Sequence, residues 1–126
     1  MQRKTIETSG APAPIGPYSQ AVKCGDMLFI SGQIALDPST GLLLTVDTAT
    51  ETHRVMQNLR AVLREAGMDF RNVVKTTIFL SDMSLFGEVN AVYASYLSGD
   101  FPARETVAVS GLPKGANVEI SMVACA

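Results

Sequence analysis

Apolar residues between Asp47 and Gly67 repeat with the period of a helix, whereas the segments around them repeat with the period of a strand. The apolar stripe follows i, i+4, i+7 spacing and consists of Val55, Met56, Leu59, Val62, Leu63 and Ala66. Thr48 with Glu51 three residues later predicts a capping box at the start of this helix, and Gly67 predicts its end. Such an amphipathic helix needs an apolar surface to pack on, and the rest of the chain supplies mainly strands.

The remaining segments predict a β-rich framework with one further helix. The expected strands are 4–8, a hairpin that turns at Gly25 and Asp26, a strand at 42–46 after a turn at 37–41, then 73–81, 101–111 and 117–126. The Pro- and Gly-rich segment 10–17 predicts a loop. A second helix is expected from about 84 to 97, with Leu85, Val89, Val92 and Tyr96 on its buried side. This order predicts an α+β fold in which two helices pack on one face of a mostly antiparallel or mixed sheet.

The strand expected at 73–81 has no plainly polar face. One alternate set contains Val73, Lys75, Thr77 and Phe79, and the other contains Val74, Thr76, Ile78 and Leu80. Two helices cover only one face of such a sheet, so the second face would expose a large apolar surface to water. We therefore expect a homo-oligomer of closed symmetry that buries this second face.

Length and charge exclude several classes of protein. A chain of 126 residues forms one ordinary domain, 1–126. Lys and Arg number 10 against 12 acidic residues, and no basic cluster provides the footprint of a nucleic-acid-binding protein. The basic N-terminus is not followed by an apolar signal region, and there is no apolar run of about 18 residues. These features predict a cytoplasmic protein without a membrane span.

Three side chains with chemical potential are assigned no function. Cys24 and Cys125 fit neither a disulfide framework nor the spacing of a metal site, so both are expected to be reduced and half-buried. His53 falls in the first turn of the first helix, off the apolar stripe, and is expected to be solvated or locally hydrogen-bonded.

Arg104 stands in the run FPARETV, between a proline turn and a β-rich segment. On these neighbours alone, a structural salt bridge to a nearby acid is the favoured interpretation. Glu105 is not expected to be that acid, because successive strand residues point to opposite faces. Glu119 falls in an apolar strand between Val118 and Ile120, where an unpaired carboxylate is costly and its pKa is expected to be displaced.

Several stretches spread over nearly the whole chain are distinctive in combination. They are IGPYSQAV, LFISGQIALDPSTG, NL with AVL in the first helix, VVKTTIFLSD, VNAVY, FPARETV and LPKGANVEISMVA. Together they resemble the RidA (YjgF-type) family of reactive-imine deaminases. The resemblance implies a chorismate-mutase-like fold with a mixed six-stranded sheet, and a homotrimer that forms a trimeric barrel with three clefts between subunits. It also implies hydrolysis of 2-imino acids to 2-oxo acids and ammonia, with no cofactor and no metal. The implied substrates are 2-aminoacrylate in its imine form, 2-iminopropanoate, and 2-iminobutanoate.

On this resemblance, the family's site motif falls on Tyr18, Ser31, Asn90, Arg104 and Glu119. Arg104 would bind the substrate carboxylate, since a planar guanidinium fits a carboxylate bidentately. Glu119 would position or deprotonate the attacking water, and Tyr18 would supply a hydrogen bond to the substrate. Ser31 and Asn90 would contact the substrate. Structural interpretations stay open: Tyr18 packed on the sheet, Ser31 bonded to backbone, Asn90 bonded to a loop carbonyl, and Glu119 bonded to Arg104 across subunits or to a backbone donor.

Thr106 departs from the family pattern, because many bacterial relatives have cysteine two residues after the arginine. The change excludes a thiol nucleophile here, but imine hydrolysis needs no covalent intermediate. We assign Thr106 to substrate binding, where it would influence which imines fit.

Two other classes of function remain as alternatives. A non-catalytic, small-carboxylate-binding regulatory trimer would keep Arg104 and show no turnover. Some family members have been linked to translation inhibition or RNA cleavage, which the slightly acidic composition disfavours.

Overall fold

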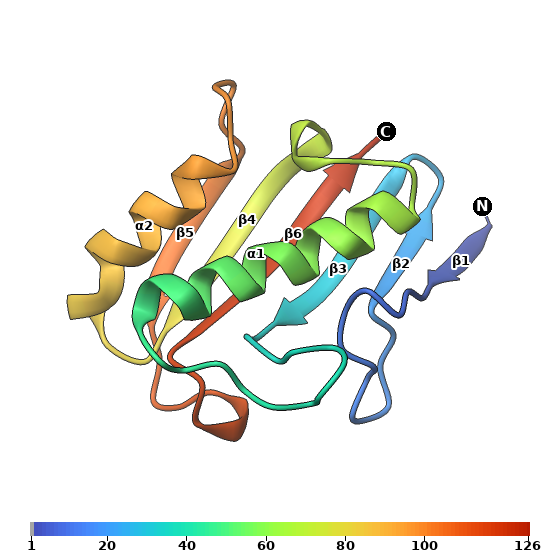
Figure 1. Cartoon of the computed structure of the whole chain (residues 1–126). Coiled ribbons are helices and arrows are strands. Elements are labelled where there is room, and N and C mark those ends of the chain that lie inside the picture. The colour runs from blue at the N-terminus through green and yellow to red at the C-terminus, as the bar shows by residue number, and fades with distance from the viewer. Residues whose placement is uncertain (1) are drawn as a thin grey trace.

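Residues 2–126 are described by a computed structural model of the chain, which is built around one six-stranded sheet (Figure 1). The strands are β1 (Arg3–Ile6), β2 (Ala21–Cys24), β3 (Met27–Gln33), β4 (Val73–Leu80), β5 (Ala103–Ala108) and β6 (Val118–Cys125). They lie in the order β1-β2-β3-β6-β4-β5. β4 and β5 are parallel, and the other neighbours are antiparallel. The prediction of an α+β fold with a mixed six-stranded sheet is confirmed.

Two helices, α1 (Thr48–Glu65) and α2 (Phe86–Ser95), cover one face of this sheet, with α2 over the β5 edge (Figure 1). Three short 3₁₀ turns complete the structure: η1 (Phe70–Asn72), η2 (Met83–Leu85) and η3 (Pro113–Gly115). The predicted stripe of α1 is confirmed, since Val55, Met56, Leu59, Val62 and Leu63 are fully buried and Ala66 packs against the core. Alternate residues of β6 face these helices and are buried as well: Val118, Ile120, Met122 and Ala124. None of the helices in residues 2–126 is both long and apolar enough to cross a bilayer.

The strand expected at 42–46 is wrong. Only Leu43 forms a bridge there, with Leu36, and the rest of the segment is irregular. The physical reason is that both edges of β3 are occupied, by β2 on one side and β6 on the other. The segment therefore cannot pair with β3, the strand that precedes it, and Leu43 and Leu44 instead pack against the core from the loop.

The predicted capping box of α1 is also wrong. The N-cap is Asp47, whose Oδ1 accepts a hydrogen bond from the Thr50 backbone N at 2.7 Å. Glu51 points away from the helix start, and it is only 1% exposed. Its carboxylate accepts two hydrogen bonds from Asn117, from the backbone N at 2.8 Å and from Nδ2 at 2.9 Å. Glu51 thus joins the start of α1 to the start of β6. The end of α1 is as predicted, with Gly67 at φ +74°.

We predict that Glu51→Ala lowers the free energy of unfolding by about 2–3 kcal/mol, because both Asn117 donors lose their acceptor in a partly buried position. Asp47→Ala should cost about 1 kcal/mol as a lost N-cap. Thr48→Ala should cost less than about 0.5 kcal/mol. Urea denaturation at a fixed protein concentration measures all three. A Thr48→Ala cost equal to that of Glu51→Ala would restore the capping box and contradict this assignment.

Helix α2 is shorter than the predicted span of about 84 to 97. The Asp82 side chain accepts a hydrogen bond from the Ser84 backbone N at 2.8 Å and starts the 3₁₀ turn η2, so the α-helix begins only at Phe86. Val89 and Val92 are buried as predicted, and so is Tyr93, whereas Leu85 and Tyr96 are only partly buried against the core.

The sheet face that points away from α1 and α2, here called the open face, carries apolar side chains. Phe29 is 50% exposed there, and Val107 is 43% exposed. Their cross-strand neighbours Val123 and Phe79 are half-buried. The expectation that the two helices leave an apolar face uncovered is confirmed, and its burial by further copies of the chain stays a prediction.

The side chains that were assigned no function lie as expected. Cys24 and Cys125 are half-buried and are not joined in a disulfide. His53 is locally bonded, with Nδ1 2.8 Å from the hydroxyl oxygen of Tyr96.

Candidate functional site

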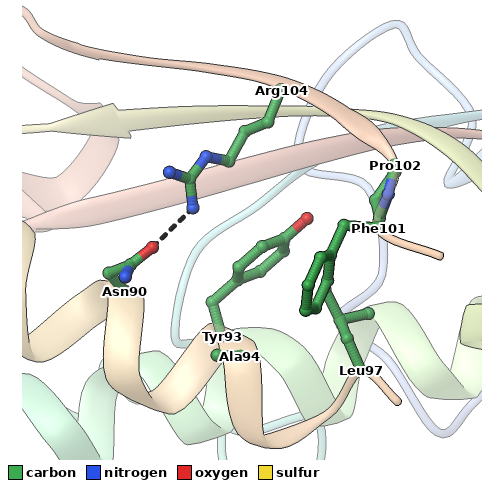
Figure 2. Close-up of a pocket in the computed structure, with 7 residues that line it drawn as sticks. All are labelled: Asn90, Tyr93, Ala94, Leu97, Phe101, Pro102 and Arg104. Atoms are coloured by element: carbon green, nitrogen blue, oxygen red, sulfur yellow. Dashed lines mark hydrogen bonds between the residues drawn. The ribbon is translucent and has the colours of Figure 1, made fainter. Parts of the chain in front are cut away.

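Arg104 lies on β5, an edge strand, and its side chain reaches toward α2 (Figure 2). Its Nη1 donates a hydrogen bond to Oδ1 of Asn90 at 2.6 Å. The guanidinium carbon lies 5.6 Å from the ring centre of Phe86 and 5.5 Å from that of Tyr93. These cation–π contacts and the Asn90 bond hold the fork of an exposed arginine in one place. Asn90 therefore binds Arg104, not the loop carbonyl of the structural interpretation.

No carboxylate of residues 2–126 lies within 4 Å of the Arg104 guanidinium, so its structural salt bridge is not formed within this chain. Glu105 lies on the opposite face as predicted, where it contacts Lys75 at 3.2 Å and accepts a hydrogen bond from Thr77 at 2.6 Å. Among the described residues, Asn90 is the one hydrogen-bond partner of Arg104. The fork therefore keeps donors available for a ligand, and a carboxylate is the ligand that fits them best.

A pocket of about 410 Å³ adjoins Arg104 (Figure 2). It is lined by Asn90, Tyr93, Ala94, Leu97, Phe101, Pro102 and Arg104. The Tyr93 hydroxyl is already engaged, since it donates to Oγ1 of Thr76 at 3.0 Å, and burial raises the pKa of Tyr93. Arg104 is thus the cationic group of an otherwise largely apolar pocket.

Thr106 lies two residues after Arg104 on the same face of β5. Its Oγ1 is buried and has no hydrogen-bond partner in the part of the chain that the structure describes. A buried hydroxyl without a partner is costly, and Thr106 lines neither the Arg104 pocket nor the pocket that contains Glu119.

Glu119 lies on β6 and belongs to a second group of predicted site residues. Burial raises the pKa of its carboxyl group above the ordinary value, and no nearby cation opposes that shift. The carboxylate lies over Gly32 at an irregularity of the β3–β6 pairing, and a Cβ at position 32 would collide with it. Gly32 is therefore required for the carboxylate to occupy this position.

Ser31 and Tyr18 line the same pocket as Glu119, which has a volume of about 340 Å³. The Ser31 hydroxyl donates to the backbone O of Ser19 at 2.6 Å, as its structural interpretation expected. Tyr18 is exposed on the loop that precedes β2, and its hydroxyl oxygen accepts a weak bond from the Ile15 backbone N at 3.3 Å. The Tyr18 hydroxyl proton remains available to a ligand.

The six predicted residues thus form two clusters on opposite faces of the sheet. Arg104 pairs in register with Thr76, whose side chain is buried beneath α2. Glu119 pairs with Phe79, which lies three residues after Thr76 on β4. Because strand residues alternate between faces, Phe79 and Glu119 lie on the open face. The two pockets share no residue. A single chain does not bring the Arg104 guanidinium and the Glu119 carboxyl group together.

Sequence reasoning missed three contributors. Gly32, inside a strand pattern, is the kind of glycine that marks an irregularity or a close approach, so its signal was present in the run ISGQ. Phe86 and Tyr93 share a helical stripe with Asn90, and this spacing could have identified them as walls around Arg104.

We predict that Glu119→Gln raises the melting temperature at neutral pH. The raised pKa of Glu119 means that its charged form is disfavoured in the folded protein. Ionisation of Glu119 therefore lowers the free energy of unfolding at pH values above that pKa, and this destabilisation disappears below about pH 4. The matched control is Glu105→Gln. Bonds from Thr77 and Lys75 lower the pKa of Glu105, so its loss should reduce the melting temperature at neutral pH and have no effect in acid. Thermal melts at pH 7 and about pH 3 measure both signs. Equal shifts for both variants would contradict the burial of Glu119.

Comparison with known proteins matches the chain to one family. The model of the family described as Endoribonuclease L-PSP matches residues 8–126. A mouse protein named 2-iminobutanoate/2-iminopropanoate deaminase is 49% identical over 122 residues, which cover 97% of this chain and 90% of the relative. Protein DfrA of Myxococcus xanthus is 52% identical over 126 residues, covering 98% of this chain and 96% of the relative.

Solved structures agree with this match over the whole fold. The crystal structure of RidA from an Antarctic Psychrobacter species has a TM-score of 0.94 at 41% identity, covering 98% of this chain and 99% of that one. The YjgF gene product of E. coli has a TM-score of 0.92 at 41% identity, covering 97% and 98%. The predicted resemblance is confirmed, and the chain belongs to the RidA (YjgF-type) family, whose model carries the description Endoribonuclease L-PSP.

Proposed function

We propose that this protein hydrolyses reactive 2-imino acids to 2-oxo acids and ammonia in the cytoplasm. The observation that carries the proposal is the Arg104 fork, which is held by Asn90 and two aromatic rings and has no carboxylate partner in residues 2–126. Every 2-imino acid has a carboxylate next to the reacting carbon. Bidentate binding to Arg104 would fix that carboxylate and, with it, the orientation of the C=N bond.

The reaction needs one activated water and no change of oxidation state. Glu119 takes a proton from water while the water oxygen bonds to C2 of the imine, the C=N π pair moves to the nitrogen, and the nitrogen gains a proton from solvent. Protonated Glu119 then returns its proton to the nitrogen of the carbinolamine. Ammonia leaves as the C–N bond breaks, the hydroxyl gives its proton to solvent, and the C=O bond of the 2-oxo acid forms. Burial of Glu119 suits this base role, because its raised pKa makes the carboxylate a better proton acceptor than an ordinary glutamate.

Tyr18, Ser31 and Thr106 complete the proposed site. The Tyr18 hydroxyl donates to the bound substrate or to the departing nitrogen. Ser31 holds the Tyr18 loop through its bond to Ser19 and presents its oxygen to the pocket. Thr106, two residues after Arg104 on the same face of β5, would act through its backbone or through the shape of the site and so influence which imines fit.

The two clusters require a second copy of the chain. We propose a homotrimer of closed symmetry in which the β5 edge of one subunit meets the open face of the next, so that Arg104 of one copy and Glu119 of its neighbour share a cleft. The uncovered apolar residues of the open face support this arrangement. The trimer is the chorismate-mutase-like barrel that the family resemblance implies.

The names of the mammalian relatives support the same reaction, since proteins from mouse and human that are 49% and 47% identical are named 2-iminobutanoate/2-iminopropanoate deaminase. The retained Arg104 also fits a regulatory protein that binds small carboxylates without turnover. The deaminase is preferred because Glu119, a carboxylate with no binding partner among residues 2–126, would hinder the capture of an anion, whereas the raised pKa of its carboxyl group suits proton transfer.

The decisive experiment generates 2-aminoacrylate in situ with a separate dehydratase and measures ammonia and pyruvate release with and without the protein. Acceleration over buffer is expected, together with a sedimentation coefficient of a trimer. Absence of acceleration on this and on a larger 2-imino acid would leave the carboxylate-binding regulator as the function. A stable monomer in analytical ultracentrifugation would remove the shared cleft.

A further inference from the structure

We propose that the pocket beside Glu119 selects the substrate by its side chain, with Ile15 and Ile34 as the residues that determine specificity. The inference rests on the proposed function and deepens it. It assigns the two pockets different tasks: the Arg104 pocket binds the carboxylate, and the Glu119 pocket binds the apolar substituent of the reacting carbon.

The Glu119 pocket has a polar end and an apolar end. Tyr18, Ser31 and Glu119 form the polar end. The apolar end is formed by Pro12, Ile15, Ile34, Leu36 and Pro113. A few convergent polar groups beside a larger apolar wall are the usual composition of a site that orients a small molecule by one end and selects it by the other.

Buried side chains fix the position of the inner wall of the apolar end. Ile34 and Leu36 are buried and pack with Ala116 in a small cluster separate from the main core. The side-chain amide of Asn58, which is itself fully buried, donates to the backbone O of Ile34 at 3.1 Å and of Leu36 at 3.0 Å. The segment that carries both residues is therefore fixed before any ligand arrives.

The loop wall of the pocket is held as firmly by Gln20. This buried side chain accepts a hydrogen bond from the Thr8 backbone N and donates to the backbone O atoms of Thr8, Ala11 and Pro12, at distances of 2.7 to 3.2 Å. The backbone N of Ile15 donates to the hydroxyl of Tyr18. The Ile15 side chain is 62% exposed, so this wall offers its apolar surface to whatever enters.

The geometry of the substrate places its side chain at this end. The reacting carbon of a 2-imino acid is trigonal and has three substituents: the carboxylate, the nitrogen and the side chain. The three substituents diverge by about 120° in one plane, so when Arg104 binds the carboxylate, the nitrogen and the side chain both extend away from Arg104. The proposal assigns the nitrogen to the polar end of the Glu119 pocket and the side chain to its apolar end.

Volume indicates the class of side chain. The Glu119 pocket of a single chain measures about 340 Å³, whereas by the same measure one water needs roughly 10–15 Å³. A methyl or ethyl substituent would contact only part of the apolar wall. A branched aliphatic substituent such as isobutyl would bury more of Ile15 and Ile34, and each added methylene in such a pocket is worth about tenfold or more in kcat/KM.

The test compares 2-imino acids with methyl, ethyl and isobutyl side chains, each produced in situ by a flavin-dependent amino acid oxidase. We expect wild type to favour isobutyl over methyl by about a thousandfold in kcat/KM, since isobutyl has three more carbons and each is worth about tenfold. Ile15→Ala, a change at an exposed position, should reduce that ratio about tenfold. Leu97→Ala, the matched control in the other pocket, should leave the ratio at its wild-type value.

A ratio that Ile15→Ala does not change, or that Leu97→Ala changes equally, would overturn the inference. Calorimetric binding of pyruvate and of its isobutyl analogue, 4-methyl-2-oxopentanoate, separates this failure from failure of the proposed function. An Ile15-dependent preference for the larger oxo acid without any turnover would retain the selective pocket and reject the deaminase. Turnover without side-chain preference would do the reverse.

Discussion

Arg104→Ala should reduce kcat/KM for 2-aminoacrylate hydrolysis by about thirtyfold or more. Removal of one partner of a close charge pair costs about 2–5 kcal/mol, and each 1.36 kcal/mol is a factor of ten in rate. Loss of Arg104 should weaken substrate binding and also disorder the orientation of the C=N bond, because Arg104 fixes the substrate through its carboxylate. Asn90, Phe86 and Tyr93 would remain in place without the group that they hold.

Arg104→Lys separates charge from geometry. A lysine keeps the cation but loses the planar fork, and its ammonium cannot bond Asn90 and both carboxylate oxygens in the same arrangement. We expect a loss of about tenfold or more, intermediate between wild type and Arg104→Ala. Initial rates of ammonia release at several substrate concentrations measure both variants.

Arg71→Ala is the matched control for these variants. Arg71 is an exposed arginine that pairs with Asp69 at 2.9 Å, outside both pockets that carry the predicted site residues. Its removal should leave kcat/KM within about twofold, since an exposed pair contributes little. Full activity of Arg104→Ala, or an equal loss in Arg71→Ala, would show that carboxylate capture does not depend on Arg104.

The fold was predictable where local pattern and packing agree. The stripe of α1 and the strands β4 and β6 have one buried face each. The helical period identifies α1, and β-branched and aromatic residues identify β4. The segment 42–46 has the same apolar character as a strand, but its fate depends on whether a sheet edge is free, which only the strand order decides. The capping box failed for a related reason, because Glu51 has a better partner in Asn117, 66 residues away.

The candidate site divides in a similar way. That Arg104 and Glu105 diverge follows from strand alternation and was predicted correctly. The opposite placement of Arg104 and Glu119 could not be predicted from spacing, since it depends on the register of β4 against both β5 and β6. Gly32 beneath the Glu119 carboxylate likewise follows from the irregular pairing of β3 with β6.

Mixing two inactive variants should restore activity if the site is shared between subunits. Arg104→Ala removes the carboxylate-binding group, and Glu119→Gln removes the proton acceptor, so each homotrimer should be nearly inactive. In a mixed trimer, a cleft is intact when the Glu119→Gln subunit supplies Arg104 and its Arg104→Ala neighbour supplies Glu119. For random mixing of equal amounts in a closed ring, this occurs at about a quarter of the clefts.

The two variants would be denatured together and refolded, and ammonia release would be compared with that of each variant refolded alone. Native mass spectrometry would confirm that mixed trimers form. The control is a mixture of Arg104→Ala with Asn90→Ala. Arg104 and Asn90 lie in one cluster, so the same subunit supplies both residues to any cleft. Mixing these two variants should therefore restore no activity. Recovery to about a quarter of wild type in the first mixture requires that Arg104 and Glu119 act from different chains. If the mixed trimers stay inactive, Arg104 and Glu119 do not act together across a subunit boundary. That result would contradict the shared cleft that we infer from their positions on opposite faces of the sheet.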